Sequence, residues 1–159
     1  MTIEEPLAIR QITVTESVVI PRTPDQVWDF TQDYRRRPEW DASVMAAEVL
    51  ACDGPPRVRV RMRGGVDCVF QYKVFDRPRR TSLAMSEVRS WLLAGGGGTW
   101  TYDAVDGGTR WTQHNTIVFR NAFLGVCFGA IARWQLARST RRAMLQAQRL
   151  IAGRGRALP

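Results

Sequence analysis

Alternating hydrophobic and polar residues predict β-strands along most of this chain. Residues 11–20 carry isoleucine or valine at nearly every second position, with only Glu16 and Val19 out of pattern. This is the period of a strand with one buried face. Residues 57–63 alternate four arginines with three hydrophobic residues, Val58, Val60 and Met62. Similar patterns predict further strands at residues 44–51, 66–74, 81–88, 99–105 and 109–119.

Glycine-containing turns separate several of these predicted strands. Gly64-Gly65 lies between two alternating segments, and Asp106-Gly107-Gly108 lies between the last two. Such sequences favour tight hairpins, so the strands after residue 44 are expected to form one antiparallel meander. The run Gly95–Gly98 lacks the lysine and the serine or threonine that end a phosphate-binding loop. We therefore predict that it is a flexible turn.

Helical patterns flank the meander. Thr23, Pro24 and Gln26 predict a helix that starts with a capping box, and Pro38 is expected to prevent its continuation. After the last strand, Asn121 is expected to cap a helix reaching about residue 152, ~45 Å long at about 1.5 Å per residue. The face of this helix that we expect on the sheet is Leu136, Thr140, Ala143, Ala147 and Leu150. The opposite face carries Arg138, Arg141, Arg142 and Arg149.

The length of 159 residues is that of one ordinary domain, so residues 1–159 are interpreted as a single domain with flexible ends at 1–10 and 153–159. Cys52, Cys68 and Cys127 form no C-x-x-C pair, which argues against a disulfide framework and a zinc site. Neither a signal peptide nor an apolar run long enough to span a bilayer is recognised. A cytoplasmic location is the expectation.

The net charge of +8 is unevenly distributed along the chain. Residues 1–56 carry −5 and residues 57–159 carry +13, and no Asp or Glu follows Asp106. Such an asymmetry attracts nucleic acids, anionic lipids or acidic proteins. The alternative is that the arginines pair with the acidic first third of the same fold. No nucleic-acid-binding motif accompanies the charge, so no specific nucleic-acid partner is predicted.

The order of elements, together with three short motifs, resembles a known superfamily. The motifs are Val27-Trp28-Asp29-Phe30 with Asp33, Pro38-Glu39-Trp40-Asp41, and Gly107-Gly108-Thr109. Nearly the whole chain is similar to the START-like (SRPBCC) superfamily, in particular to its polyketide cyclase/dehydrase-like branch. The resemblance implies an α+β helix-grip fold. In that fold, a curved antiparallel sheet of six to seven strands surrounds a long C-terminal helix, short helices follow the first strand, and a hydrophobic cavity lies between sheet and helix.

The residues expected to line such a cavity are mostly aromatic, with two amides and small or aliphatic residues from the helix. Inward amides need partners, so they would orient a largely apolar ligand through one or two hydrogen bonds. The alternative is that the aromatic residues form an ordinary core. On the hairpin the predicted inward set is Phe70, Tyr72 and Val74. The candidate ligand-binding residues are Phe70, Tyr72, Met85, Trp100, Tyr102, Trp111, Gln113, Asn115, Ala132 and Leu136.

Catalytic and metal-binding groups are sparse. Glu87 lies at an expected inward position and is a candidate acid or base with a raised pKa. Alternatively, it reaches solvent or an arginine such as Arg61 or Arg89. One carboxylate without a partner does not define a mechanism, so no catalytic residue is assigned. His114, the only histidine, is expected to point outward, and no metal or cofactor is predicted.

Three hypotheses of function follow. The first is binding, transport or sequestration of a small hydrophobic or lipid-like molecule between the sheet and the C-terminal helix. The second, which rests on the family resemblance, is a polyketide cyclase, dehydratase or aromatase. The third is an interaction protein that uses the basic C-terminal helix to bind a second copy, an acidic partner, a membrane or a ribonucleoprotein. Phe123, Cys127, Ile131 and Trp134 would add an apolar stripe to that helix.

Overall fold

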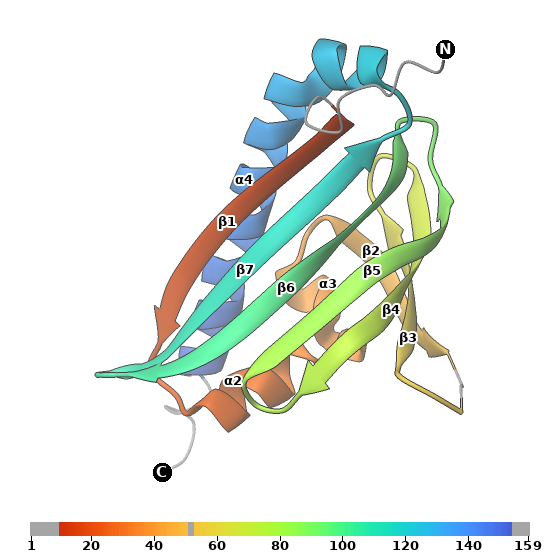
Figure 1. Cartoon of the computed structure of the whole chain (residues 1–159). Helices are drawn as coiled ribbons and strands as arrows, with labels where there is room; N and C mark the ends of the chain where they lie inside the picture. The colour runs from red at the N-terminus through yellow and green to blue at the C-terminus, as the bar shows by residue number, and fades with distance from the viewer. Residues whose placement is uncertain (1–9, 51–52, 154–159) are drawn as a thin grey trace.

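A curved antiparallel sheet of seven strands is present within residues 10–50 and 53–153, the part of the chain that the computed structural model describes (Figure 1). The strands are β1 (Gln11–Ile20), β2 (Val44–Leu50), β3 (Arg57–Met62), β4 (Val66–Asp76), β5 (Arg80–Arg89), β6 (Leu93–Val105) and β7 (Gly108–Phe119). The helical elements are α2 (Pro24–Thr31), η1 (Tyr34–Arg36, a 3₁₀ turn), α3 (Arg37–Trp40) and α4 (Ala122–Gly153). This arrangement confirms the predicted helix-grip fold. Of the expected flexible ends, residues 1–9 and 154–159 lie outside the described residues.

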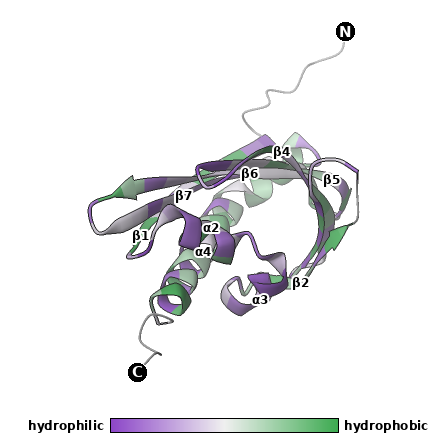
Figure 2. Ribbon diagram, turned by 90° about the horizontal axis from the view of Figure 1, so that it is seen from below, coloured by the Kyte–Doolittle hydropathy of each residue, from purple (hydrophilic) through white to green (hydrophobic). Residues whose placement is uncertain are grey.

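The strands have the order β1-β7-β6-β5-β4-β3-β2 in the sheet. Strands β2 to β7 are therefore neighbours in chain order, whereas β1 lies beside the last strand, β7. It pairs with β7 along its whole length, from Gln11 opposite Val118 to Ile20 opposite Thr109. The chain must then cross from one edge of the sheet to the other before β2. The helices α2 and α3 lie on this crossing, and with α4 they occupy the concave side of the sheet (Figure 2). The fold thus brings the crossing segment and α4 onto one face.

The start of α2 follows the sequence prediction, but its end does not. The Gln26 N–H donates to Thr23 Oγ1 at 3.4 Å, and the Thr23 N–H donates to Gln26 Oε1 at 3.2 Å, which completes the capping box. The helix already ends at Thr31. Pro38 does not end it and instead lies in the first turn of α3, where a missing N–H costs no hydrogen bond.

The glycine run 95–98 lies inside β6 and is not a turn, contrary to the prediction. All four glycines pair with β7, and Gly97 and Gly98 also pair with β5. A Cβ at Gly96 would lie 2.4 Å from the Thr116 carbonyl oxygen, and a Cβ at Gly97 would lie 2.4 Å from the Leu83 carbonyl oxygen. The glycines therefore permit a close approach of the neighbouring strands.

The predicted inward position of Val74 is also wrong. The pairing of β4 with β5 shifts register between Tyr72 and Val74, which interrupts the alternation. Val74 is consequently 38% exposed. Phe75 instead packs edge-on against Trp28 and Tyr72, with ring centroids 5.3 and 5.0 Å away.

The long helix α4 buries one face mainly against β1. Arg133 donates to the Thr13 carbonyl oxygen and Gln148 donates to the Val19 carbonyl oxygen, which fixes the helix along this strand. In its second half the buried residues are Thr140, Ala143, Met144, Ala147 and Ile151. The predicted residues Leu136 and Leu150 are only half-buried, whereas the four arginines expected on the opposite face are exposed as predicted.

Candidate functional site

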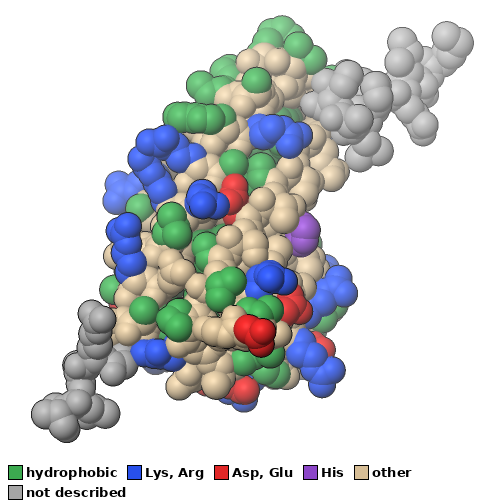
Figure 3. Space-filling model, turned by 90° about the vertical axis from the view of Figure 1, so that its left-hand side faces the viewer, with side chains coloured by type: hydrophobic (Ala, Val, Ile, Leu, Met, Phe, Trp, Pro, Cys, Tyr) green, Lys and Arg blue, Asp and Glu red, His purple; other side chains and the backbone are tan. Residues whose placement is uncertain are grey.

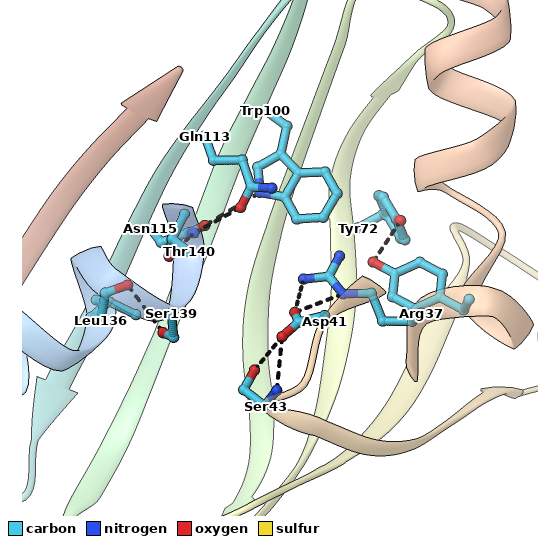
Figure 4. A network of polar contacts seen from close by, with 11 residues as sticks. Arg37, Asp41, Ser43, Tyr72, Trp100, Gln113, Asn115, Leu136, Ser139 and Thr140 are labelled. Atoms are coloured by element: carbon cyan, nitrogen blue, oxygen red, sulfur yellow. Dashed lines mark hydrogen bonds and ion pairs between the residues drawn. The ribbon is translucent and has the colours of Figure 1, made fainter. Parts of the chain in front are cut away.

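Two amides of β7 lie on the concave face of the sheet, where α4 crosses it. Gln113 is 2% exposed and Asn115 is half-buried. Asn115 Nδ2 lies 2.9 Å from Gln113 Oε1 and 3.2 Å from Thr140 Oγ1 of α4, and it donates to both. Trp100 Nε1 of β6 donates to Asn115 Oδ1 at 3.3 Å. The Asn115 amide therefore connects two strands to the helix (Figure 4).

Gln113 retains an unused donor. Its Oε1 accepts from Asn115, but its buried Nε2 has no hydrogen-bond partner within the described residues. A buried N–H group without a partner costs about 1–3 kcal/mol. The group is therefore suited to donate to a carbonyl or hydroxyl oxygen that enters from the concave side.

At Gly96 and Gly98, next to Trp100, the inner surface of β6 carries no side chain. A Cβ at Gly98 would lie 2.7 Å from Asn115 Oδ1, and a Cβ at Gly96 would lie 3.2 Å from Met85 Sδ. Gly96, Gly98, Met85 and Asn115 are all only half-buried although the sheet is covered on this side. Met85 and Asn115, whose side chains point to this face, are therefore not completely covered.

A buried ion pair from α3 faces the same region. Arg37 Nη2 lies 2.8 Å from Asp41 Oδ2, and Nε donates to the same oxygen at 3.0 Å. The other carboxylate oxygen accepts from the Ser43 N–H and hydroxyl. The Arg37 guanidinium lies over the rings of Trp40 and Trp100, with Cζ 4.2 and 4.7 Å from their centroids. Figure 4 shows this group on the opposite side of the site from Asn115 and Thr140.

A chain of hydroxyls and one amide joins the crossing segment to the sheet. The Tyr72 hydroxyl donates to Gln32 Oε1 at 2.5 Å and lies 2.9 Å from the Tyr34 hydroxyl. Gln32 Nε2 donates to the Tyr102 hydroxyl, which lies 2.8 Å from Thr31 Oγ1. Because Thr31 donates to the Val27 carbonyl oxygen, Tyr102 is the donor to Thr31. The chain thus runs in one direction from the sheet into α2.

Burial is the largest influence on the pKa of each of these three tyrosines. It raises the pKa of Tyr72, and the neighbouring Tyr34 raises it further. It also raises the pKa of Tyr102, although the bonds to Thr31 and Gln32 counteract part of the effect. The pKa of Tyr34 is raised by burial and partly restored by the positive charge of Arg37. All three hydroxyls therefore remain neutral near pH 7 and act as hydrogen-bond donors or acceptors.

The remaining aromatic candidates belong to a packed cluster. The Trp111 ring, fully buried, contacts Trp40 and Trp100 edge-on at 5.6 and 5.5 Å and stacks on Tyr102 at 6.3 Å. Such contacts stabilise a core beyond the area they bury. Trp111 and Tyr102 are therefore part of the packed core next to the half-buried region. Trp100 belongs to this core and also contacts Asn115, at the edge of that region.

The structure sorts the sequence-predicted residues into two groups. Those at the half-buried region or its edge are Met85, Trp100, Gln113, Asn115 and Leu136, whereas Ala132 packs against the core cluster of Ile12, Leu93 and Phe119. Those buried in the surrounding core are Phe70, Tyr72, Tyr102 and Trp111.

Glu87 does not lie at an inward position, contrary to the sequence prediction. Its side chain is 56% exposed and pairs with Arg57, not with Arg61 or Arg89. Its φ of 51° interrupts the strand alternation, which turns the side chain outward. We therefore do not retain it as an acid or base. His114 points outward as predicted and lies 2.8 Å, Nδ1 to Oγ1, from Thr15.

A metal site, a reactive cysteine and a second pocket are the other candidate sites among the described residues. These residues contain no cluster of three or more histidine, cysteine or acidic side chains that could hold a metal ion. The Cys68 thiol is buried, which with the nearby Asp67 raises its pKa to about 11. An open depression of about 910 Å³ lies at the end of the sheet, away from the two amides. It is lined by Pro21, Arg22, Thr23, Pro24, Gln26, Ala104, Gly107 and Gly108.

Sequence reasoning missed part of this arrangement. Asp41 was interpreted only as part of the motif Pro38-Glu39-Trp40-Asp41, and Arg37 was assigned no role, although an arginine four residues before an aspartate in a short helix favours an ion pair. Gln32 lies directly after the end of α2, where helix periodicity no longer predicts the direction of a side chain. Gly98 was predicted to lie in a turn, so its position in a strand, facing Asn115, was not anticipated.

A family model and several solved structures match the chain. The model described as polyketide cyclase / dehydrase and lipid transport matches residues 11–151, which confirms the predicted resemblance. No curated protein sequence matches significantly. No helix in residues 10–50 and 53–153 is long and apolar enough to cross a membrane.

The similar structures share the fold at low identity. The protein TTHA0849 from Thermus thermophilus has a TM-score of 0.76 at 18% identity, over 90% of this chain and 99% of its own. The Zhui aromatase/cyclase from Streptomyces sp. R1128 has a TM-score of 0.69 at 19% identity, over 92% and 97%. A START superfamily protein from Mycobacterium smegmatis has a TM-score of 0.60 at 10% identity, over 84% and 98%. These likenesses show a common architecture.

Proposed function

The chain belongs to the polyketide cyclase / dehydrase and lipid transport family, and we propose that it binds a small, mainly hydrophobic molecule between the concave face of its sheet and α4. The observation that carries the proposal is the unused Gln113 donor beside the half-buried Asn115 amide and the bare strand at Gly98. An apolar molecule with one carbonyl or hydroxyl group fits this chemistry. The proposed contacts are Met85, Trp100, Gln113, Asn115 and Leu136.

Substitution of one glycine provides a test with a matched control. In Gly98→Val the new Cβ would lie 2.7 Å from Asn115 Oδ1 and would displace this amide, whereas at Gly95 a Cβ meets no atom within 4 Å. Native mass spectrometry of gently purified protein, followed by titration with a series of apolar alcohols and ketones, should show one-to-one complexes for wild type and Gly95→Val. Gly98→Val should lose them. Absence of any complex in wild type, or equal binding by both variants, would contradict the proposal.

The alternative of a cyclase or dehydratase is supported by the likeness to an aromatase/cyclase. Arg37, Asp41 and Tyr34 would be its polar groups. Both Asp41 oxygens already accept hydrogen bonds, and Tyr34 is neutral near pH 7, so neither is a ready base. Turnover of a polyketide-like substrate that survives in Arg37→Met and Tyr34→Phe would remove these residues from the mechanism.

One form of the third hypothesis, a homodimer or an acidic partner held by the arginine face of α4 alone, rests only on charge. Among described residues, Arg141 pairs with Glu16 of the same chain at 3.3 Å, whereas Arg138, Arg142 and Arg149 form no ion pair. Two copies would bring like charges together, which opposes a homodimer at this face.

A further inference from the structure

The first half of α4 exposes hydrophobic side chains on the side away from the sheet. Phe123 is 73% exposed, Val126 71%, Ile131 54% and Trp134 58%. Trp91, which is 66% exposed, packs edge-on against Phe128 at 5.9 Å and extends this surface. We call the set the α4 apolar surface: Trp91, Phe123, Val126, Cys127, Phe128, Ile131 and Trp134. Exposed hydrophobic side chains gathered on one element in this way often mark an interaction site.

The outward face of α4 changes from apolar to basic along the helix. Steps of three and four residues place Phe123, Cys127, Ile131 and Trp134 on one side, and the next residues on that side are Arg138, Arg141 and Arg142. The Arg138 guanidinium lies over the Trp134 ring, with Cζ 5.3 Å from the centroid, at the junction. Figure 3 shows hydrophobic side chains gathered at one end of the molecule and basic side chains further along.

The positive charge of α4 distinguishes between the possible partners of the α4 apolar surface. No acidic residue follows Asp106 in the sequence, so the partner surface should be negative. A second copy of the chain would present the same apolar and basic residues, and its arginines would be repelled. A bilayer with anionic headgroups offers both phosphates for the arginines and an apolar boundary for tryptophan and phenylalanine.

We propose that the first half of α4 docks onto an anionic lipid bilayer, with the α4 apolar surface in the interfacial layer and Arg138, Arg141 and Arg142 on the headgroups. The docking uses the outward side of the helix and is independent of ligand binding on its inward side. Ala132 and Leu136, on that inward side, would lie within about 10 Å of the bilayer surface, the diameter of a helix.

Vesicle co-sedimentation tests the apolar contribution. Wild type should bind vesicles of phosphatidylcholine with about 30% phosphatidylglycerol, and binding should weaken as sodium chloride rises from about 0.05 to about 0.5 M. Ile131→Ala/Trp134→Ala should bind at least about tenfold more weakly. The matched control is Met45→Ala/Val49→Ala, which removes two equally exposed hydrophobic side chains from β2 and should bind like wild type.

Charge reversal tests the basic contribution in the same assay. Arg138→Glu/Arg142→Glu should lose binding, whereas Arg79→Glu/Arg110→Glu, with the same net charge but exposed positions outside α4, should retain most of it. Equal binding by these two variants, equal binding to pure phosphatidylcholine, or no binding by wild type would overturn the proposal. A Trp134-dependent dimer in sedimentation equilibrium without vesicle binding would also overturn it, in favour of a second copy.

A fluorescent label on Cys127 gives a measurement that needs no substitution in the proposed surface. Cys127 is exposed and Cys68 is buried, so a nitrobenzoxadiazole maleimide should label Cys127 selectively in a Cys52→Ser background. Its emission should shift to shorter wavelength on addition of anionic vesicles. An unchanged emission maximum in the presence of bound vesicles would place the contact elsewhere and contradict the proposed orientation.

Discussion

Asn115 Nδ2 lies 2.9 Å from Oε1 of Gln113, its second neighbour on β7. Alternate residues of a strand share a face, so both amides point to the concave side. Their bond occupies the Gln113 acceptor and leaves its Nε2 donor unused within the described residues. The orientation of the Asn115 amide thus determines which hydrogen-bonding atom of Gln113 stays without a partner.

Replacement of Asn115 by leucine should destabilise the protein. The substitution removes the donor to Gln113 Oε1 and the acceptor for Trp100 Nε1. We expect the free energy of unfolding in urea to fall by about 1–3 kcal/mol, because buried polar atoms lose their partners. His114→Leu, at the exposed neighbouring position, should change it by less than about 0.5 kcal/mol. Equal stability of the two variants would show that the amide connection is energetically unimportant.

The ion pair between Arg37 and Asp41 should show strong coupling in a double-mutant cycle. Its side chains are 13% and 8% exposed, so Arg37→Met would leave a carboxylate with little access to water. We expect a loss of about 3–5 kcal/mol for this variant, and clearly less than the sum of both single losses for Arg37→Met/Asp41→Leu. Urea denaturation measures all three variants.

The neighbouring pair of Arg36 and Glu39 is the control for this cycle. The Glu39 side chain is 48% exposed, so solvent screens the pair and Glu39→Gln should cost less than about 1 kcal/mol. Additive losses at Arg37 and Asp41 would contradict the view that these two residues act as one buried unit.

Stability should fall steeply at alkaline pH because the three tyrosines of the chain are all buried. Their pKa values are raised in the folded state, so above about pH 10 the unfolded chain releases protons that the folded chain retains. The stability that depends on the neutral, buried tyrosines is fully present below about pH 10. It is then lost by up to about 1.4 kcal/mol per pH unit and tyrosine.

Absorbance at 295 nm, which reports tyrosinate, checks this prediction. The signal should appear together with loss of far-ultraviolet circular dichroism, whereas urea-unfolded protein should titrate near pH 10. In Tyr72→Phe the alkaline slope of the unfolding free energy should decrease. Tyrosinate formation near pH 10 in protein that remains folded would contradict the buried hydroxyl chain.

Much of the fold could be predicted because its signals are local. The alternation at residues 11–20, the capping box at Thr23 and the turn at Gly64-Gly65 each specify their own backbone. The periodicity of α4 identified its exposed arginines. The resemblance then supplied the wrapping of the sheet, which no local pattern determines.

The site could be predicted only in part because its signals depend on neighbouring strands. Gly96 and Gly97 are needed in β6 because the neighbouring strands β5 and β7 leave no room for a Cβ there. This close approach of the strands cannot be recognised in the sequence. A register shift reversed the expected direction of Val74, and the positive φ of Glu87 turned it outward. The inward direction of Gln113 was predicted correctly because β7 keeps a regular register with β1.

The most direct test of the proposed function is a titration of ¹⁵N-labelled protein with 1-naphthol, followed by the side-chain amide signals in ¹H–¹⁵N spectra. This molecule has an apolar body and one hydroxyl group. We expect saturable shifts, with intermolecular nuclear Overhauser effects, at the Gln113 and Asn115 side-chain amides and the Trp100 indole. The exposed Asn121 amide, which caps α4, should be unaffected. Shifts confined to α4's outward face, or none at Gln113 and Asn115, would contradict the account.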